Sequence, residues 1–367
     1  MSHRLPPALV LLLCAAIAAC GRARVDSGSG GRCAHVQATR QVRGVALCED
    51  VWSCERPPGG PLDTVSLTRL APCGNLIGPL VLYLPDRHQH GDVRSTNART
   101  DLRLYLGQAG IRTWALGYRT HTRTLAARGS QAPAMDWDFD TFADDVQWAM
   151  RFIRGTEPSR GVWLAAAGDG ATFAYEMARR GEPLLAGIVA LDGAAVAGPA
   201  AGGGRLLEGG VPGLAWDASS ALLDRVQTAP RSASPVSGYP TAEAALSGLL
   251  FVAPAYGGNG GLSAARDGAS SPSVVARYLA GEDRWWPRSV LRTRLPGGGK
   301  RAVPVLAFAA GRRGEEWARV VRESAQRFGG DQAVVQVLAP MGHLDVLVGR
   351  AAPHQVHDPV RVFVTSR

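Results

Sequence analysis

The sequence has little lysine and no block of a single charge. Lys300 is its only lysine, so almost all of its 40 basic residues are arginines, and the formal net charge is +9. The arginines are dispersed and alternate with acidic residues, as in GRRGEEWARVVRES at residues 311–324. Nucleic-acid-binding surfaces usually show clustered basic residues. We therefore expect no nucleic-acid partner.

The sequence also lacks an apolar run long enough to span a bilayer. The run from Leu5 to Ala19 falls short of the roughly 20 residues that a spanning helix needs. A basic start, a short apolar core and small residues are typical of a secretory signal. IAACG at residues 17–21 resembles a bacterial lipobox, which implies that residues 1–20 are a lipoprotein signal and that Cys20 is lipidated. Residues 21–32 would then be a flexible tether.

This N-terminal pattern predicts an exported lipoprotein, anchored to a membrane by its lipid and facing the periplasm or the cell exterior. The alternative is an ordinary signal peptide that is cleaved near Ala19.

Cysteine is absent after residue 73. Downstream of Cys20, four cysteines lie in one short stretch, namely Cys33, Cys48, Cys54 and Cys73. An even, clustered set in an exported protein predicts two disulfides, with three possible pairings. Zinc binding is the alternative, but the spacing contains no Cys-x-x-Cys pair. We therefore expect residues 33–75 to form a small, disulfide-stapled N-terminal extension.

Buried strands and amphipathic helices alternate after residue 76. GPLVLYLPD at residues 78–86 has the composition of a strand buried on both faces, and DFDTFADDVQWAMRFIRG at 138–155 has the pattern of an amphipathic helix. This alternation predicts an α/β fold with a doubly wound, mostly parallel sheet. A Gly-, Ala-, Ser- and Pro-rich insertion interrupts it and divides the chain into a first core part (76–192), a helical lid insertion (193–300) and a second core part (301–367).

A strand, a turn of small residues and a helix follow one another in VWLAAAGDGATFAYEMARRG, residues 162–181. Such a turn thrusts one side chain out above the sheet if small residues stand two positions to either side of it. Two registers fit. In one, Gly168 takes the exposed position and Gly170 follows; in the other, Asp169 takes it and Ala167 precedes. The first register supplies no side chain for covalent catalysis, whereas the second supplies a carboxylate.

The order of these features resembles the α/β-hydrolase superfamily over residues 76–367. The turn after a central strand, the lid-length insertion and MGHLD at residues 341–345 carry the resemblance. The resemblance implies that His343 is the catalytic base and that a nucleophile stands at the turn, called the elbow, where this chain lacks the usual serine. It also implies an oxyanion loop after the first buried strand, at Asp86, Arg87 and His88.

A catalytic triad needs an acidic residue that orients the histidine. Its usual position on this fold, after the strand that follows the lid, reads AAGRRG at residues 309–314 and offers no carboxylate. The other position, after the preceding strand, supplies Asp192. The alternative for Asp192 is an ordinary turn aspartate.

Two patterns are candidates for metal binding. HQHGD at residues 88–92 matches half of a metallo-β-lactamase-like zinc motif, but Val93 replaces the next histidine and only His121 lies at a suitable distance. The acidic run DWDFD at 136–140 lacks the glycine and the terminal glutamate of a calcium loop, and is typical of a helix start. We therefore expect no metal and no cofactor.

The sequence thus predicts a degenerate catalytic triad. We expect a non-catalytic or weakly active protein that binds a partner or a small apolar or ester-like ligand at the former active-site cleft. The alternative is an active ester, halide or epoxide hydrolase with Asp169 as nucleophile, His343 as base and Asp192 as acid. A purely structural envelope protein is the third class. An open pocket beneath the lid would argue against that third class.

Overall fold

The computed structural model describes residues 24–26, 32–42, 45–60, 62–74, 78–91, 97–121, 136–196, 204–253, 261–262, 270–291 and 294–367. The predicted signal peptide, Cys20 and most of the predicted tether lie outside these ranges. Within them, no helix combines the length and the apolar character that a membrane span requires.

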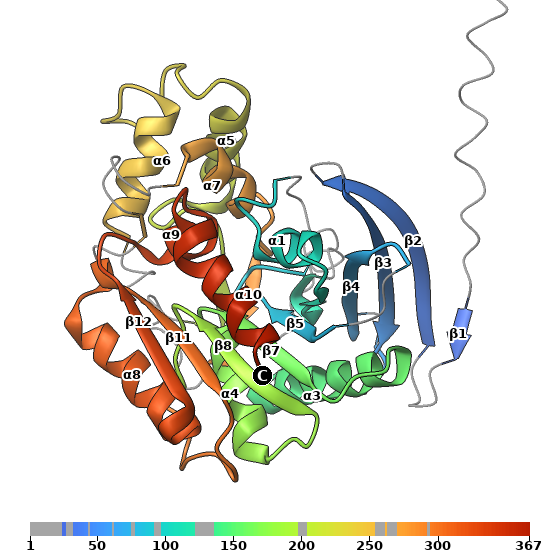
Figure 1. Cartoon of the computed structure of the whole chain (residues 1–367). Coiled ribbons are helices and arrows are strands. Elements are labelled where there is room, and N and C mark those ends of the chain that lie inside the picture. Colours follow the sequence, from blue (N-terminus) through green and yellow to red (C-terminus); the bar gives the residue numbers. More distant parts are fainter. Residues whose placement is uncertain are drawn as a thin grey trace, which may run out of the picture.

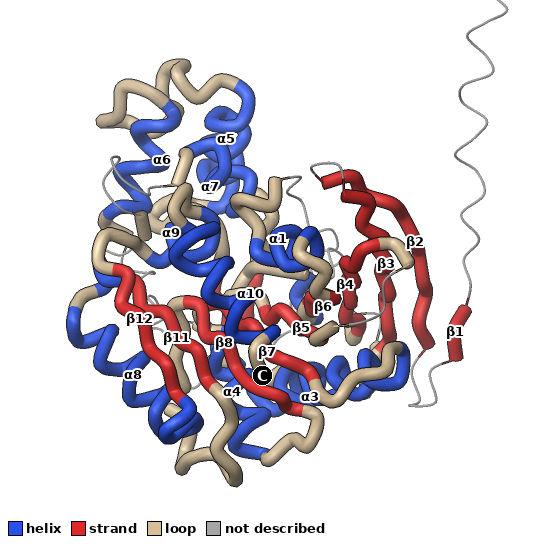
Figure 2. The backbone as a smooth tube through the Cα atoms, viewed as in Figure 1, coloured by secondary structure: helices blue, strands red, loops and turns tan. Residues whose placement is uncertain are grey.

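A ten-stranded sheet runs through the described part of the chain, in the order β1-β2-β3-β4-β6-β5-β7-β8-β11-β12 (Figures 1 and 2). Its second half is parallel throughout, as the alternation of strands and helices predicts. These parallel strands are β5 (Leu80–Leu84), β6 (Arg112–Gly117), β7 (Val162–Ala167), β8 (Leu185–Leu191), β11 (Val305–Ala310) and β12 (Ala333–Leu338).

The N-terminal extension continues this sheet with antiparallel strands, which are β1 (Arg24–Asp26), β2 (Arg32–Val42), β3 (Val45–Glu55) and β4 (Thr64–Pro72). The prediction of two disulfides is confirmed: Cys33 is bonded to Cys54, and Cys48 to Cys73. Cys33 stands directly opposite Cys54 across the β2–β3 pair, so the strand register fixes this pairing.

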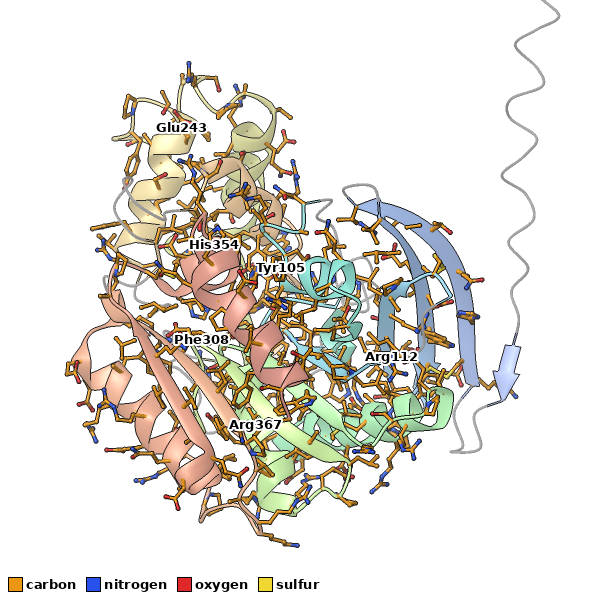
Figure 3. All side chains as sticks on the ribbon, viewed as in Figure 1. Tyr105, Arg112, Glu243, Phe308, His354 and Arg367 are labelled. Carbon is orange, nitrogen blue, oxygen red and sulfur yellow. A yellow bond between two sulfur atoms is a disulfide. The ribbon has the colours of Figure 1, made fainter. Side chains whose placement is uncertain are left out.

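Buried ion pairs join the extension to the rest of the sheet. Arg69 of β4 pairs with Asp50 of β3 at 3.0 Å and with Glu157, which follows α3 (Phe139–Thr156). Arg112 of β6 reaches the same Glu157 at 3.3 Å and lies between the extension and the core (Figure 3). A buried charge needs such partners, because desolvating it alone is costly.

Helices cover both faces of the sheet (Figure 1). One face packs against α3, α4 (Gly170–Arg180) and α8 (Glu315–Gly329), and the other against α1 (Leu102–Gln108) and α10 (Asp358–Thr365). The sequence explains α3 well. Asp138 caps its first turn by accepting a hydrogen bond from the Thr141 backbone at 2.9 Å, and its apolar stripe is fully buried at Phe142, Val146, Ala149 and Ile153.

The described part of the insertion contains three α-helices that cluster beyond one end of the sheet, α5 (Trp216–Thr228), α6 (Ala242–Phe251) and α7 (Pro272–Leu279) (Figure 1). A short two-stranded sheet, β9 (Leu206–Glu208) with β10 (Trp285–Pro287), accompanies them. The backbone N–H of Asp283 donates to the carbonyl of His88 at 2.6 Å, and that of Leu344 donates to Gly261 at 3.0 Å. The insertion therefore lies at the carboxyl ends of the parallel strands, where open α/β sheets bind ligands.

Candidate active site

The turn after β7 has Gly168 at its apex. Gly168 has φ +47°, in the left-handed region, whereas Asp169 has φ −66° and ψ −21° and belongs to the start of α4. A Cβ atom at Gly170 would collide with the backbone oxygen of Pro85, so the elbow packs tightly beneath the loop that follows β5. The structure therefore corresponds to the register in which the exposed position carries no side chain.

The carboxyl group of Asp86 fills the space above this apex. A Cβ atom built on Gly168 would clash with the Cγ and both carboxylate oxygens of Asp86. In a serine hydrolase the nucleophile's side chain projects from this atom. A carboxylate from the loop after β5 thus stands where the elbow would otherwise present its nucleophile.

Two backbone N–H groups hold this carboxylate. Asp86 Oδ1 accepts from the backbone of Asp169 at 2.7 Å and from that of Arg87 at 2.8 Å. An oxyanion hole on this fold consists of the N–H group after the nucleophile and an N–H group from the loop after the first buried strand. Asp86 therefore occupies the oxyanion donors with its own oxygen, as the carboxylate product of an ester hydrolysis would.

The imidazole of His343 lies between two carboxylates. Its Nδ1 is 2.6 Å from Asp192 Oδ2, and its Nε2 is 3.0 Å from Asp86 Oδ2. His343 is 2% exposed and Asp192 is fully buried. The two residues that the resemblance assigns as base and acid are thus in contact, and the position of the nucleophile's oxygen is taken by Asp86.

Asp192 is held in place by several donors at the carboxyl end of β8. It accepts from the Ala310 backbone at 2.8 Å, from the Trp317 indole at 2.7 Å and from the Arg313 guanidinium at 3.1 Å. Its own backbone has φ +51°, a strained conformation for a non-glycine residue. These contacts exceed what an ordinary turn aspartate needs and fix the carboxylate against His343.

The charge states of His343, Asp192 and Asp86 follow from this geometry. Burial alone would lower the pKa of His343, but its hydrogen bonds to Asp192 and Asp86 and their charges raise that pKa to about 9. Burial would raise the pKa of Asp192, yet the charge of Arg313 and the contact with His343 hold it well below its usual range. Burial likewise opposes the ionisation of Asp86, and His343 lowers its pKa. At neutral pH the site is an imidazolium between two carboxylates.

Three other predicted site residues serve different contacts. The carboxylate of Asp169 pairs with the guanidinium of Arg87 at 2.6 Å, so Asp169 does not stand at the apex as the second register proposed. His88 donates from Nδ1 to the Asp283 carbonyl at 2.9 Å. Burial lowers the pKa of His88 to about 4, which keeps that ring neutral.

A cavity of about 70 Å³ lies beside these residues and under the insertion. Tyr83 and Pro85 line it from the chain that leads to Asp86, Leu191 lines it from the end of β8, and Arg277 and Tyr278 line it from α7. Burial raises the pKa of Tyr83 to about 12, so its hydroxyl group stays protonated. Such mixed apolar and hydrogen-bonding walls are found in small-molecule sites, and a volume of this size suits only a very small ligand.

Solved structures match the chain along most of its length, although no family model matches it and no curated protein matches it in sequence. A protein from Sulfolobus solfataricus assigned as a lipase has a TM-score of 0.68 at 20% identity, with 90% of this chain and 99% of that chain covered. A highly thermostable carboxyl esterase from Bacillus coagulans, in complex with glycerol, has a TM-score of 0.52 at 13% identity, with 90% and 98% covered. At these identities the likeness concerns the fold and not the activity.

Proposed function

We propose that this chain, which has the α/β-hydrolase fold, is an exported lipoprotein that binds a small ligand beside its former active site and does not hydrolyse esters there. One observation carries the proposal. The Asp86 carboxyl group occupies both the nucleophile's place above Gly168 and the oxyanion donors.

Three requirements of ester hydrolysis are unmet in this arrangement. Gly168 supplies no attacking atom. The oxyanion donors are occupied by Asp86 Oδ1 and are not free for a substrate oxygen. His343, with its pKa raised to about 9, is protonated at neutral pH and cannot accept a proton. Losing one triad member already costs on the order of 10⁴-fold in rate, so we expect no turnover.

Covalent catalysis by a carboxylate is the second candidate, and the structure favours Asp86 over Asp169 for that role. Asp86 Oδ2 would attack an alkyl carbon and form an ester while the leaving group departs with the bonding electrons. Water would then attack the ester carbonyl and give its proton to His343, the bond to the alkyl oxygen would break, and the alcohol would leave while the Asp86 carboxylate is regenerated. Esterification would remove one of the two charges that raise the pKa of His343, so a partly protonated His343 would slow this second step. An alkyl adduct on Asp86 would therefore be detectable at neutral pH.

Activated esters test the proposal. Wild type and His343→Ala should hydrolyse nitrophenyl acetate and butyrate at the same slow rate, set by surface nucleophiles. A wild-type rate that His343→Ala lowers by about 10³-fold or more would overturn the proposal. Incubation with bromoalkanes at neutral pH, followed by peptide mass spectrometry, distinguishes ligand binding from covalent catalysis by a carboxylate. Only covalent catalysis requires an alkyl adduct on Asp86.

Ligand binding is tested through the cavity. Short-chain fatty acids and their esters are suitable probes, because the walls combine apolar and hydrogen-bonding groups. Val274→Trp would fill the space from α7 and should abolish any rise in Tm that a probe produces in wild type. Val252→Trp is the matched control, because Val252 is 55% exposed. Equal shifts in the two variants would contradict ligand binding in this cavity.

Export and lipidation rest on the N-terminal pattern and on the two disulfides, which form in oxidising compartments. Labelled palmitate should be incorporated into the wild-type protein and not into Cys20→Ser. A mature N-terminus near residue 20 without lipid would instead indicate an ordinary signal peptide.

A further inference from the structure

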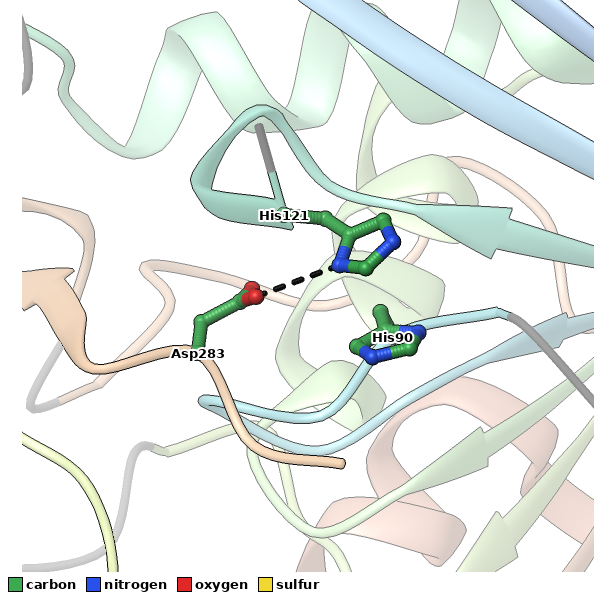
Figure 4. A group of neighbouring side chains, drawn as sticks. All are labelled: His90, His121 and Asp283. Carbon is green, nitrogen blue, oxygen red and sulfur yellow. Dashed lines mark hydrogen bonds and ion pairs between the residues drawn. The ribbon is translucent and has the colours of Figure 1, made fainter. Parts of the chain in front are cut away.

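Three metal-ligating side chains converge near the site from separate segments (Figure 4). His90 comes from the loop after β5, His121 ends the short helix η2 (Arg119–His121) that follows β6, and Asp283 lies just before β10 in the insertion. One ligand atom from each residue lies within 4.8 Å of the other two. The topology therefore gathers two imidazoles and a carboxylate at the carboxyl ends of two neighbouring strands.

Of the two histidines in HQHGD at residues 88–92, only His90 belongs to this group. His88 turns away and bonds to the backbone of Asp283. The ring of His90 instead stacks on that of His121, with centroids 3.6 Å apart and planes inclined by 26°. His121 Nδ1 is 3.2 Å from Asp283 Oδ1. The loop that carries the motif supplies one ligand, and the other two come from parts of the chain far away in sequence.

The carboxylate is positioned as a metal ligand usually is. Asp283 Oδ2 accepts from the hydroxyl group of Thr120 at 2.8 Å, and the backbone of Asp283 makes two hydrogen bonds to His88. Asp283 and His90 are both buried, at 8% and 7% exposure. Outer contacts that fix a ligand's orientation are a recurrent feature of metal sites.

We propose that His90, His121 and Asp283 bind a divalent transition-metal ion of the zinc class. Imidazole is a borderline ligand that suits this class, and two imidazoles with one carboxylate are a ligand set that zinc accepts. Ligand atoms at zinc distances in a tetrahedron stand about 3.4 Å apart. The ion must therefore draw the most distant pair together by about 1.4 Å. The stacked imidazoles must also turn so that one ring nitrogen of each points at the ion. Three protein ligands leave a fourth position for water or a small oxygen ligand, and His90 also lines the cavity.

Metal binding at this place links the insertion to the core. Asp283 belongs to the insertion, whereas His90 and His121 follow core strands. The ion binds the folded arrangement and not the unfolded chain, so saturating metal should raise Tm. This expectation is independent of whether the former active site turns over esters.

Zinc binding to the untagged protein is the test. After chelator treatment and dialysis, Zn²⁺ is titrated in competition with a chromophoric chelator, and Co²⁺ absorption reports the coordination. Wild type should bind one Zn²⁺ with a rise in Tm. His121→Ala and Asp283→Asn should bind at least about 100-fold more weakly, and Thr120→Val about 10- to 100-fold more weakly.

His354→Ala is the matched control, because the side chain of His354 is 79% exposed and its loss should not change the affinity. Far-UV circular dichroism verifies the fold of each variant. His121 is only partly buried, so its variant keeps the test valid if Asp283→Asn fails to fold. Absence of Zn²⁺ binding in wild type, or equal affinity in wild type and His121→Ala, would overturn the proposal.

Discussion

Replacing Asp86 with asparagine should weaken the dependence of stability on pH. The folded protein raises the pKa of His343 from 6.5 to about 9. A histidine of this kind stabilises the fold fully below pH 6.5, and the contribution disappears as pH rises through 9. The difference corresponds to about 3 kcal/mol at 1.36 kcal/mol per pKa unit. Asp86 is one of the two carboxylates responsible, and its loss should lower the pKa of His343 by about 1 to 2 units.

Urea denaturation at about pH 6 and pH 9.5 measures the effect. From the lower to the higher pH, the free energy of unfolding of the wild type should fall by about 1 to 3 kcal/mol more than that of Asp86→Asn. Burial also raises the pKa of Glu282 to about 8. The ionisation of Glu282 therefore also lowers the free energy of unfolding as pH rises through this range. Both proteins are therefore compared in a Glu282→Gln background.

Asp140→Asn provides the matched control, because the side chain of Asp140 is 59% exposed and should leave the pH dependence unchanged. If wild type and Asp86→Asn lose equal stability over this range, the assignment of Asp86 as a charged partner of His343 is wrong.

Three further predictions concern the elbow, the extension and a helix cap. Gly168→Ser should destabilise the fold by about 2 to 4 kcal/mol, because its Cβ meets the Asp86 carboxyl group and its φ is left-handed. Much of that loss should return in Gly168→Ser/Asp86→Ala, and strictly additive losses in denaturation would contradict the overlap. Removal of the Cys33–Cys54 disulfide, which spans 21 residues, should cost about 3 kcal/mol by denaturation, whereas a cost below about 1 kcal/mol would contradict a stabilising cross-link. Asp138→Ala should lower Tm through about 1 kcal/mol of lost capping, while Asp140→Ala should not.

The sequence predicted the parts of the site that follow from strand order. Each parallel strand ends at the same edge of the sheet, so His343 after β12 and Asp192 after β8 meet there. The helix α3 and the two disulfides also follow from local patterns. These features depend on periodicity and on spacing, which a single sequence displays.

The role of Asp86 was missed because it depends on packing between distant segments. Its residue type suggested only a member of the oxyanion loop. A glycine at the apex leaves an empty space, and the sequence does not show which side chain fills it. The missing elbow serine together with an acidic residue directly after the first buried strand is the signal that could have found it. The same limit applies to Asp283, which meets His90 and His121 only in the folded chain.

The central claim is that the Asp86 carboxylate occupies the nucleophile's place and contacts His343. The pKa of His343 in the ligand-free protein tests this claim most directly. Nitrogen-15 NMR of labelled histidine, assigned with His343→Ala, measures it. We predict a value of about 9, with both ring nitrogens protonated at neutral pH. A pKa at or below the ordinary 6.5 would mean that His343 is a free base at neutral pH. It would contradict the placement of the His343 ring between two ionised carboxylates.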